Sequence, residues 1–168
     1  MKLVLEADRT RTLKWFTGSS FGVHPDMESH TGSIFTFTLG KGSISSESTK
    51  QKVNSRSSTK GELIAIGNKI AKVIWTKRFL NHQGYKLKVS ILYLDNTNTI
   101  KLVNNGKGTY GKRTRHFDFK YYYITDLIQR KEIEIKFFSS IDMMADFMTK
   151  PLTESKFIQQ RNKILNKV

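Results

Sequence analysis

The sequence predicts one α/β domain built on a mixed five-stranded sheet, with an antiparallel meander at one side, parallel strands at the other and helices on its faces. Three consecutive segments rich in β-branched and aromatic residues, separated by turn residues, indicate the meander. Two later strand-length segments alternate with stretches of helical periodicity, which is typical of parallel strands joined by right-handed crossovers. A chain of 168 residues suits a single hydrophobic core. We therefore expect one domain over residues 1–168, with 1–11 as an N-terminal connecting segment and 153–168 as a C-terminal basic helix.

The meander takes up the first third of the chain. Residues 12–17 are expected to form a short first strand that ends at a break over residues 18–20, Gly-Ser-Ser. The second strand is expected within 31–40, and the third within 43–52 after a glycine-containing turn.

A long helix is expected from Thr59 to about Gln83. Its apolar residues recur at the spacing of one helix face. Thr59, with Glu62 three residues later, fits a capping box, in which each side chain satisfies a backbone N–H of the first turn. After Gly84, residues 88–95 form a compact apolar run, as expected for a strand buried on both faces.

The second half of the chain continues the alternation of helices and strands. The remaining expected elements are a short helix over 97–103, a helix over about 116–130, a strand over 132–138, a helical turn over 142–149 and a basic amphipathic helix from Thr153 onward. Pro151 separates the last two, because proline cannot continue a helix.

The charge of the chain points to a polyanionic partner. Lys and Arg number 29 against 14 Asp and Glu, which gives a formal net charge of +15. Such an excess produces a positive field that attracts nucleic acid, although a basic surface can also serve solubility alone. The sequence has no cysteine, so disulfides, thiolate metal sites and cysteine nucleophiles are excluded.

The hydropathy pattern argues against a membrane partner. No apolar stretch approaches the roughly 18 to 20 residues needed to span a bilayer. The N-terminus alternates apolar with charged residues and lacks the features of a signal peptide. We therefore expect an intracellular protein, cytoplasmic or nuclear.

Three carboxylates fall where such a fold would bring side chains together. Asp95 ends the buried strand, at the sheet edge where open α/β sheets bind their ligands. Glu62 lies on the first turn of the long helix, and Asp146 begins the short helical segment after the last strand. Carboxylates hold Mg²⁺ while leaving positions open for water and a phosphate. Each acid also has a structural interpretation: Glu62 in the capping box, Asp95 as a cap of the next helix, and Asp146 as favourable charge at a helix start.

Five strings of the sequence resemble, in order, the motifs of one family. They are HPDMESHTG, SSTKGELIAI, YLDNTNTIKL, KRTRHFDFKYY and MMADFMTKPL. The second, third and fifth carry the three acids and resemble the segments Ser-Ser-Thr-Glu-Ala-Glu-Leu/Tyr, Asp-Asn-x-Ala and Ala-Asp-x-x-Thr-Lys-Pro-Leu. The family is the ribonuclease H domain of copia-type LTR retrotransposon Pol polyproteins, and the resemblance runs from about residue 3 to residue 165.

The resemblance implies a ribonuclease H-like fold and metal-dependent hydrolysis of the RNA strand of an RNA–DNA hybrid. It implies two Mg²⁺ ions, or Mn²⁺, with Glu62, Asp95 and Asp146 as catalytic metal ligands. The partner would be an RNA–DNA hybrid or another nucleic acid, gripped through phosphates and 2′-hydroxyls. The resemblance also implies an upstream reverse transcriptase domain in an intact polyprotein, and we expect the isolated domain to be a monomer.

Position 18 departs from the family pattern. The family closes its first strand with a catalytic aspartate, in a context like Trp-Trp-Val-Asp-Ala-Ser. Here residues 15–20 read Trp-Phe-Thr-Gly-Ser-Ser, so that Gly18 stands at the aspartate. That acid bridges both metals in the family scheme, and its loss removes a ligand from each. We therefore expect impaired hydrolysis, and the alternative is a non-catalytic nucleic-acid-binding remnant with the same fold.

Basic residues of a glycine-rich loop are the predicted nucleic-acid contacts. Lys107, Lys112, Arg113 and Arg115 are expected to touch a phosphate backbone, with a plain solvated loop as the alternative. The same loop nearly matches a nucleotide-binding loop, but Arg113 replaces the hydroxyl that would bind Mg²⁺. The histidines and acids of residues 24–30 are interpreted as solvated turn residues rather than a metal cluster.

Overall fold

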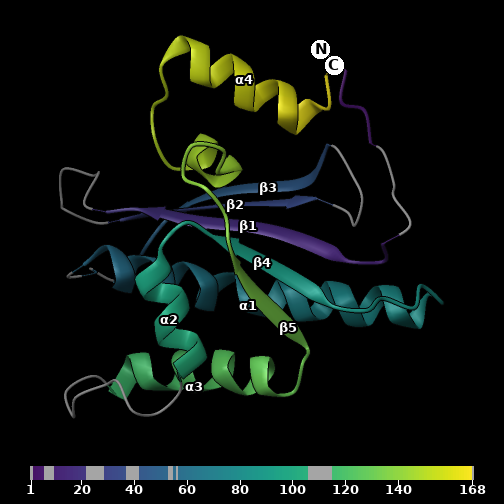
Figure 1. Cartoon of the computed structure of the whole chain (residues 1–168), viewed down its shortest axis with the longest axis vertical. Helices are drawn as coiled ribbons and strands as arrows, with labels where there is room; N and C mark the ends of the chain where they lie inside the picture. The colour runs from purple at the N-terminus through teal and green to yellow at the C-terminus, as the bar shows by residue number, and fades with distance from the viewer. Residues whose placement is uncertain are drawn as a thin grey trace.

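A five-stranded mixed sheet with strand order β3-β2-β1-β4-β5 forms the centre of the molecule (Figure 1). The structure is a computed structural model that describes residues 2–5, 10–21, 29–36, 42–52, 55, 57–105 and 115–167. The strands are β1 (Leu13–Ser20), β2 (His30–Thr36), β3 (Ser43–Lys50), β4 (Ser90–Leu94) and β5 (Ile133–Phe137). The first three pair antiparallel, whereas β4 pairs parallel with both β1 and β5. The expected meander and parallel strands are therefore confirmed.

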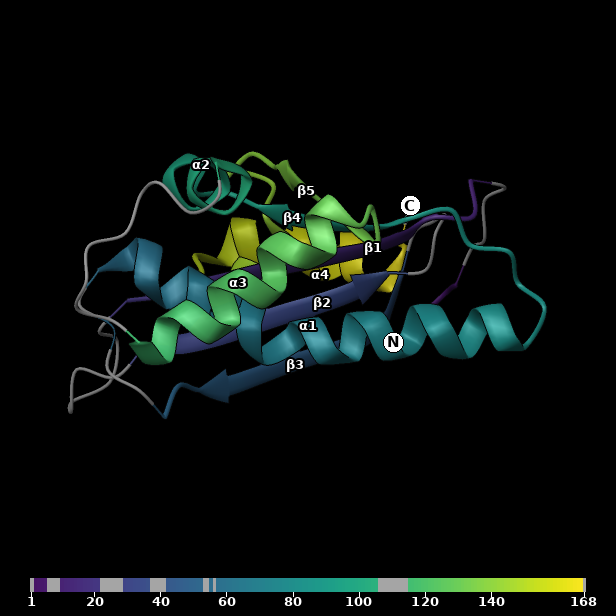
Figure 2. The same ribbon diagram turned by 90° about the horizontal axis from the view of Figure 1, so that it is seen from below.

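Helices cover both faces of the sheet. The helices are α1 (Ser58–His82), α2 (Thr97–Asn105), α3 (Arg115–Gln129), the 3₁₀ helix η2 (Met144–Met148) and α4 (Glu154–Leu165). Figures 1 and 2 show α1, α2 and α3 on one side of the sheet and η2 with α4 on the other. No helix in the described part of the chain is long and apolar enough to cross a membrane.

The first strand is longer than the sequence predicts. β1 runs through residues 18–20 without the expected break, because Gly18 pairs with Gly32 of β2 and the next two residues pair with Thr31 and His30. Pairing with a neighbouring strand keeps the backbone extended where local composition alone favours a turn. The predicted break at Gly18 is therefore wrong.

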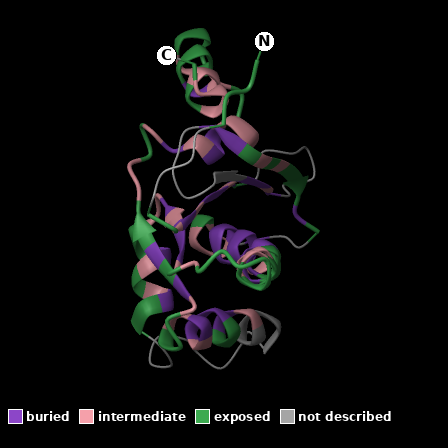
Figure 3. Cartoon of the chain, turned by 90° about the vertical axis from the view of Figure 1, so that its right-hand side faces the viewer, coloured by how far each residue is buried: buried purple, intermediate pink, exposed green. Residues whose placement is uncertain are grey.

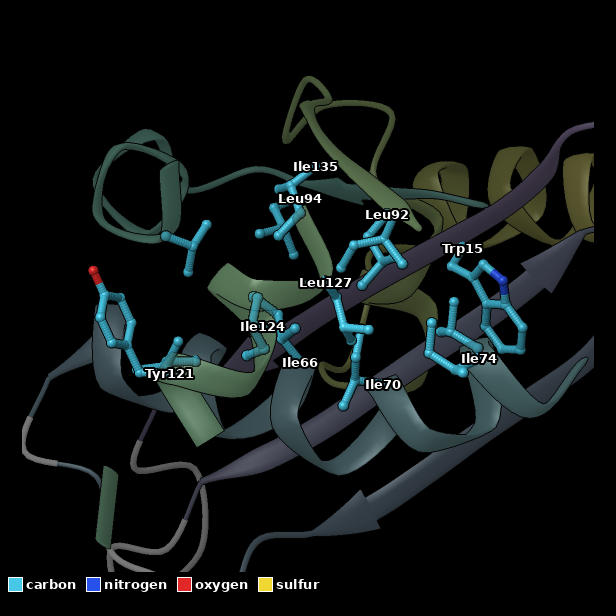
Figure 4. Packing of buried hydrophobic residues seen from close by; sticks show 14 of the residues in the cluster. Trp15, Ile66, Ile70, Ile74, Leu92, Leu94, Tyr121, Ile124, Leu127 and Ile135 are labelled. Carbon is cyan, nitrogen blue, oxygen red and sulfur yellow. The ribbon is translucent and has the colours of Figure 1, made fainter. Parts of the chain in front are cut away.

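The main hydrophobic core lies between the sheet and the helices α1 and α3 (Figure 4). Leu13 and Trp15 of β1 and Leu92 and Leu94 of β4 point into it from alternate strand positions and are at most 2% exposed. Full burial of one such side chain stabilises the fold by about 1.5–3 kcal/mol. Figure 3 shows the same organisation, with buried residues concentrated where α1 and α3 face the sheet.

A smaller core on the opposite face supports η2. Phe16 of β1 stacks on Tyr93 of β4 with ring centroids 5.0 Å apart, and both rings meet the edge of Phe138. Met143 and Ala145 pack against this group and are fully buried. The packing fixes η2 close to the centre of the sheet.

A partly buried ion pair fastens α1 to the edge strand β3. Lys69 Nζ lies 2.5 Å from Glu47 Oε2, and Lys72 binds the other oxygen of the same carboxylate. These two lysines hold the pKa of Glu47 below its ordinary value. At the other face, the backbone N–H of Val4 donates to the carbonyl of Leu165 at 3.0 Å, which joins the N-terminal segment to the end of α4.

Candidate functional site

Two of the three predicted acids lie together at one end of the sheet. Glu62 is in the second turn of α1, and Asp95 directly follows the last residue of β4. Their carboxyl groups interact through charge and through a side-chain hydrogen bond. The arrangement follows from the fold, because α1 crosses beneath the sheet where the parallel strand β4 ends (Figure 1).

Burial controls the protonation of Glu62. Desolvation raises the pKa of Glu62 to about 8, and the negative charge of Asp95 and the hydrogen bond with it act in the same direction. The side chains of Thr99 and Asn96 lower the pKa by a smaller amount. Glu62 is 5% exposed, and its Oε2 atom has no hydrogen-bond partner among the described residues. At neutral pH, Glu62 is therefore mainly protonated.

The helix caps that the sequence suggested for Glu62 and Asp95 are formed by other residues. The N-cap of α1 is Ser57, whose hydroxyl accepts a hydrogen bond from the backbone N–H of Lys60. The cap of α2 is Asn96, whose Oδ1 accepts from the N–H groups of Asn98 and Thr99 at 3.0 and 3.2 Å. The capping-box interpretation of Glu62 and the cap interpretation of Asp95 are therefore wrong.

The third acid, Asp146, is held by two lysines. It lies in the first turn of η2 but at its third residue, and it is 5% exposed. Lys150 Nζ lies 2.9 Å from its Oδ1 and Lys156 Nζ lies 3.5 Å from its Oδ2, so each carboxylate oxygen faces an ammonium group. Sequence reasoning missed both partners. The spacing of four residues between Asp146 and Lys150 was the available signal, whereas Lys156 comes from α4 and has no local signature.

The glycine at position 18 lies at the same end of the sheet as Asp95. Gly18 and Asp95 are each two residues beyond Phe16 and Tyr93, the last pair of the parallel β1–β4 ladder. A Cβ atom at Gly18 would lie 3.5 Å from the Cβ of Ala145 in η2, which is an ordinary van der Waals contact. Position 18 thus has room for a Cβ atom on the side that faces the element carrying Asp146.

Its neighbour across the sheet has no such room. A Cβ atom at Gly32 would lie 2.5 Å from Thr149 Cγ2 and 2.7 Å from the carbonyl oxygen of Ala145. Glycine at position 32 therefore allows η2 to approach β2 closely, whereas glycine at position 18 is not required by packing.

The described residues contain no group of three or more histidine, aspartate and glutamate side chains that could hold a metal ion. The structure therefore brings Glu62 and Asp95 together, and it pairs Asp146 with Lys150 and Lys156 instead. The predicted contacts Lys107, Lys112 and Arg113 lie outside the described residues, as do residues 24–28 of the histidine-containing turn. Arg115 is the first residue of α3, and the structure does not describe its side chain.

Sequence comparison identifies the relatives of the chain. It is 33% identical over 146 residues to the retrovirus-related Pol polyprotein from transposon TNT 1-94 of Nicotiana tabacum, an alignment covering 86% of this chain and 11% of that polyprotein. This chain is homologous to a segment of copia-type retrotransposon Pol polyproteins. A second Pol homologue, from transposon RE1 of Arabidopsis thaliana, is 31% identical over 127 residues, which cover 75% of this chain and 8% of the relative. The Pol segment described here thus spans about a tenth of the length of the relatives it matches.

Solved structures confirm the fold of this Pol segment. The N-terminal RNase H domain of a Mycobacterium tuberculosis protein superposes with a TM-score of 0.60 at 5% identity, covering 90% of this chain and 96% of that one. RNase H1 from Halobacterium salinarum gives 0.55 at 8% identity, covering 88% and 98%. LC11-RNase H1, solved in complex with an RNA/DNA hybrid, gives 0.55 at 11% identity, covering 82% and 93%. No protein-family model matches the sequence. At these identities the likeness shows the fold, which is the expected ribonuclease H-like fold.

Proposed function

We propose that this Pol segment is a ribonuclease H module that binds RNA–DNA hybrids and hydrolyses their RNA strand poorly, because Gly18 replaces the first catalytic aspartate. The observation that carries the proposal is the position of Gly18, level with Asp95 and directed toward η2. An acid there would complete a set with Glu62, Asp95 and Asp146. The homology to Pol polyproteins supports the hybrid as substrate, since such a polyprotein would supply an upstream reverse transcriptase domain.

The residues present do not fit a site for two Mg²⁺ or Mn²⁺ ions. Such a site needs several ionised carboxylates with free oxygen atoms. Here the pKa of Glu62 is raised to about 8, and both carboxylate oxygens of Asp146 face lysines. We therefore derive no step through a metal ion for the unaltered chain.

What the chain keeps is a basic surface on an intact fold. The net charge of +15 favours binding to nucleic acid through phosphate contacts, with strong dependence on salt. The predicted contacts Lys107, Lys112, Arg113 and Arg115 belong to this binding role. The loss of one acid impairs hydrolysis without reducing the affinity for nucleic acid. Hydrolysis depends on the acidic side chains, whereas binding depends on the lysine and arginine side chains.

The test is Mg²⁺-dependent cleavage of the RNA strand of a labelled RNA–DNA hybrid. Three proteins are compared: the unaltered chain, Gly18→Asp and Gly18→Ala. The alanine variant is the matched control, since its Cβ occupies the same space without an acid. We expect cleavage by Gly18→Asp to exceed that of the other two by several orders of magnitude, comparable to the effect of a principal catalytic group.

Two outcomes would contradict the proposal. Robust cleavage by the unaltered chain that disappears in Asp95→Asn would show that position 18 is dispensable. Absence of cleavage in all three proteins, with hybrid binding retained, would favour the second candidate function, a non-catalytic nucleic-acid-binding module. The ion pairs of Asp146 are the observation that favours this second candidate, because they neutralise an acid the chemistry would need.

A further inference from the structure

Two aromatic rings lie together on the exposed side of α1. Trp75 is 63% exposed and Phe79 is 46% exposed, and their rings stack with centroids 5.1 Å apart and planes inclined by 8°. Residues four positions apart are neighbours on one helix face. The opposite side of the same turns carries Val73 and Ile74, which are buried in the main core. The aromatic stack of Trp75 and Phe79 is therefore not needed to pack α1 onto the sheet.

The aromatic stack is far from the acid pair. Trp75 follows Glu62 by thirteen residues on α1, which corresponds to about 20 Å along the helix axis. Figure 2 shows the last turns of α1 projecting beyond the strands of the sheet. A ligand on the stack would therefore occupy a place separate from the end of β4 where Glu62 and Asp95 meet.

The charge around the stack is positive. Residues 63–94 contain no aspartate or glutamate, and they contain six basic residues: Lys69, Lys72, Lys77, Arg78, Lys86 and Lys88. Two acids approach from other elements, Glu47 of β3, which is bound by Lys69 and Lys72, and Glu132, whose Oε2 lies 3.8 Å from Arg78. Exposed aromatic rings can attract cations, but these surroundings repel a cationic ligand. The charge therefore favours an anionic partner.

Two basic residues border the rings directly. Arg78 lies three residues after Trp75, and His82 lies three residues after Phe79, so each neighbours a ring on the helix surface. The Arg78 side chain is 66% exposed. A guanidinium group has five N–H donors, so its contact with Glu132 leaves donors for an anionic group. A ligand that combines flat aromatic rings with negative charges matches both the stack and its borders.

We infer that the aromatic stack binds unpaired nucleobases of a single-stranded nucleic acid, with Arg78 and His82 at its phosphates. Every base has a flat π-face, so stacking on exposed aromatic rings is tolerant of sequence and of sugar, and single-stranded RNA and DNA should both bind. A duplex keeps its bases paired and stacked on one another, so it cannot use this surface in the same way. The inference goes beyond the proposed function and does not rest on it.

A membrane surface fits the stack less well. Helices that lie on membranes insert a continuous apolar face. The exposed side of α1 instead mixes the two rings with polar and charged residues, among them Thr76, Arg78 and His82. Two isolated rings bordered by cations suit stacked bases better than lipid tails.

The first experiment follows the fluorescence of Trp75. The chain has two tryptophans, and Trp15 is 2% exposed in the main core, so quenching by an added ligand reports on Trp75. The probes are a short oligothymidylate, the matching oligouridylate, and an abasic strand with the same number of phosphates. We expect both base-bearing strands to quench the fluorescence and the abasic strand to leave it unchanged. Equal quenching by all three strands would overturn the inference.

The second experiment compares affinities for the labelled oligothymidylate and the labelled abasic strand, measured by fluorescence anisotropy. Trp75→Ala removes the outer ring of the stack, and Trp75→Phe is the matched control, because it keeps an aromatic ring. Loss of one stacked base costs about 1–3 kcal/mol, so Trp75→Ala should bind oligothymidylate about 5- to 150-fold more weakly. Its affinity for the abasic strand should be unchanged, and Trp75→Phe should retain most of the affinity for both strands.

Two results of this comparison would contradict the inference. One is an equal loss of affinity for both strands in Trp75→Ala, which would mean that the ring does not contact bases. The other is unchanged affinity for oligothymidylate in Trp75→Ala. Circular dichroism checks that all three proteins are folded, which is expected because the Trp75 side chain is exposed.

Other occupants of the stack are distinguished by two further titrations. Vesicles of phosphatidylcholine and phosphatidylserine should leave the emission of Trp75 unchanged, and a blue shift with vesicles but no quenching by oligonucleotides would identify a membrane surface instead. Self-association that is seen by sedimentation and lost in Trp75→Ala, without quenching by oligonucleotides, would identify a second copy of the chain. Either result would make the inference wrong. No RNA–DNA hybrid is used, so failure of Gly18→Asp to cleave leaves these measurements unaffected.

Discussion

Replacing Glu62 by glutamine should stabilise the fold increasingly as the pH rises. The carboxyl titrates at about 8 in the folded chain and near its ordinary value of 4.5 in the unfolded chain. Below the lower value both states are protonated, and the residue contributes nothing to the pH dependence. Between the two values only the unfolded chain releases the proton, so stability falls by about 1.4 kcal/mol per pH unit. The loss reaches about 3 kcal/mol at pH 7 and about 5 kcal/mol above pH 8.

Glutamine keeps the shape of the protonated acid and cannot ionise, so the variant should escape this loss. The assay is urea unfolding at several values between about pH 5 and pH 8, with a chelator present. Glu134→Gln on β5 is the control, because that side chain is 48% exposed and pairs with Lys136. A stability difference between Glu62→Gln and the unaltered chain that is the same at both ends of the pH range would refute the reasoning.

Two further predictions concern packing and capping. Gly32→Ala should lower the free energy of unfolding by about 1–3 kcal/mol, because its Cβ overlaps Thr149 and Ala145, whereas Gly18→Ala should change it by less than about 1 kcal/mol. Thermal unfolding of the two variants tests this, and equal melting temperatures would contradict the close approach of η2. Asn96→Ala should cost about 1 kcal/mol through loss of the α2 cap, measured by denaturant unfolding. A similar loss in Asp95→Ala, with no loss in Asn96→Ala, would show that Asp95 is the cap instead.

The order of elements could be predicted from the sequence because each element carries its own periodicity. β4 shows this through a compact apolar run of strand length, and the first half of α1 shows it through buried apolar residues at helical spacing. The end of β1 could not be predicted in the same way. Glycine and serine at positions 18–20 favour a turn locally, and only the pairing with β2, a non-local interaction, keeps them extended.

The site was predictable in part for a similar reason. The end of β4 and the start of α1 are defined by local pattern, so the sequence could bring Glu62 and Asp95 to one end of the sheet. The caps of α1 and α2 could not be predicted, because two nearby residues can cap each helix. For α1 these are Ser57 and Thr59, and for α2 they are Asp95 and Asn96.

The hydrogen bond between Val4 and Leu165 has a mechanical consequence. Because Val4 and Leu165 are joined directly, tension applied to both ends of the chain would act first on this contact and on α4 rather than along the strands. Peeling α4 away would take Lys156 from Asp146 and expose η2, while the five-stranded sheet and its main core on the opposite face stayed folded. Under force, the contacts around Asp146 should therefore break well before the sheet and its main core unfold.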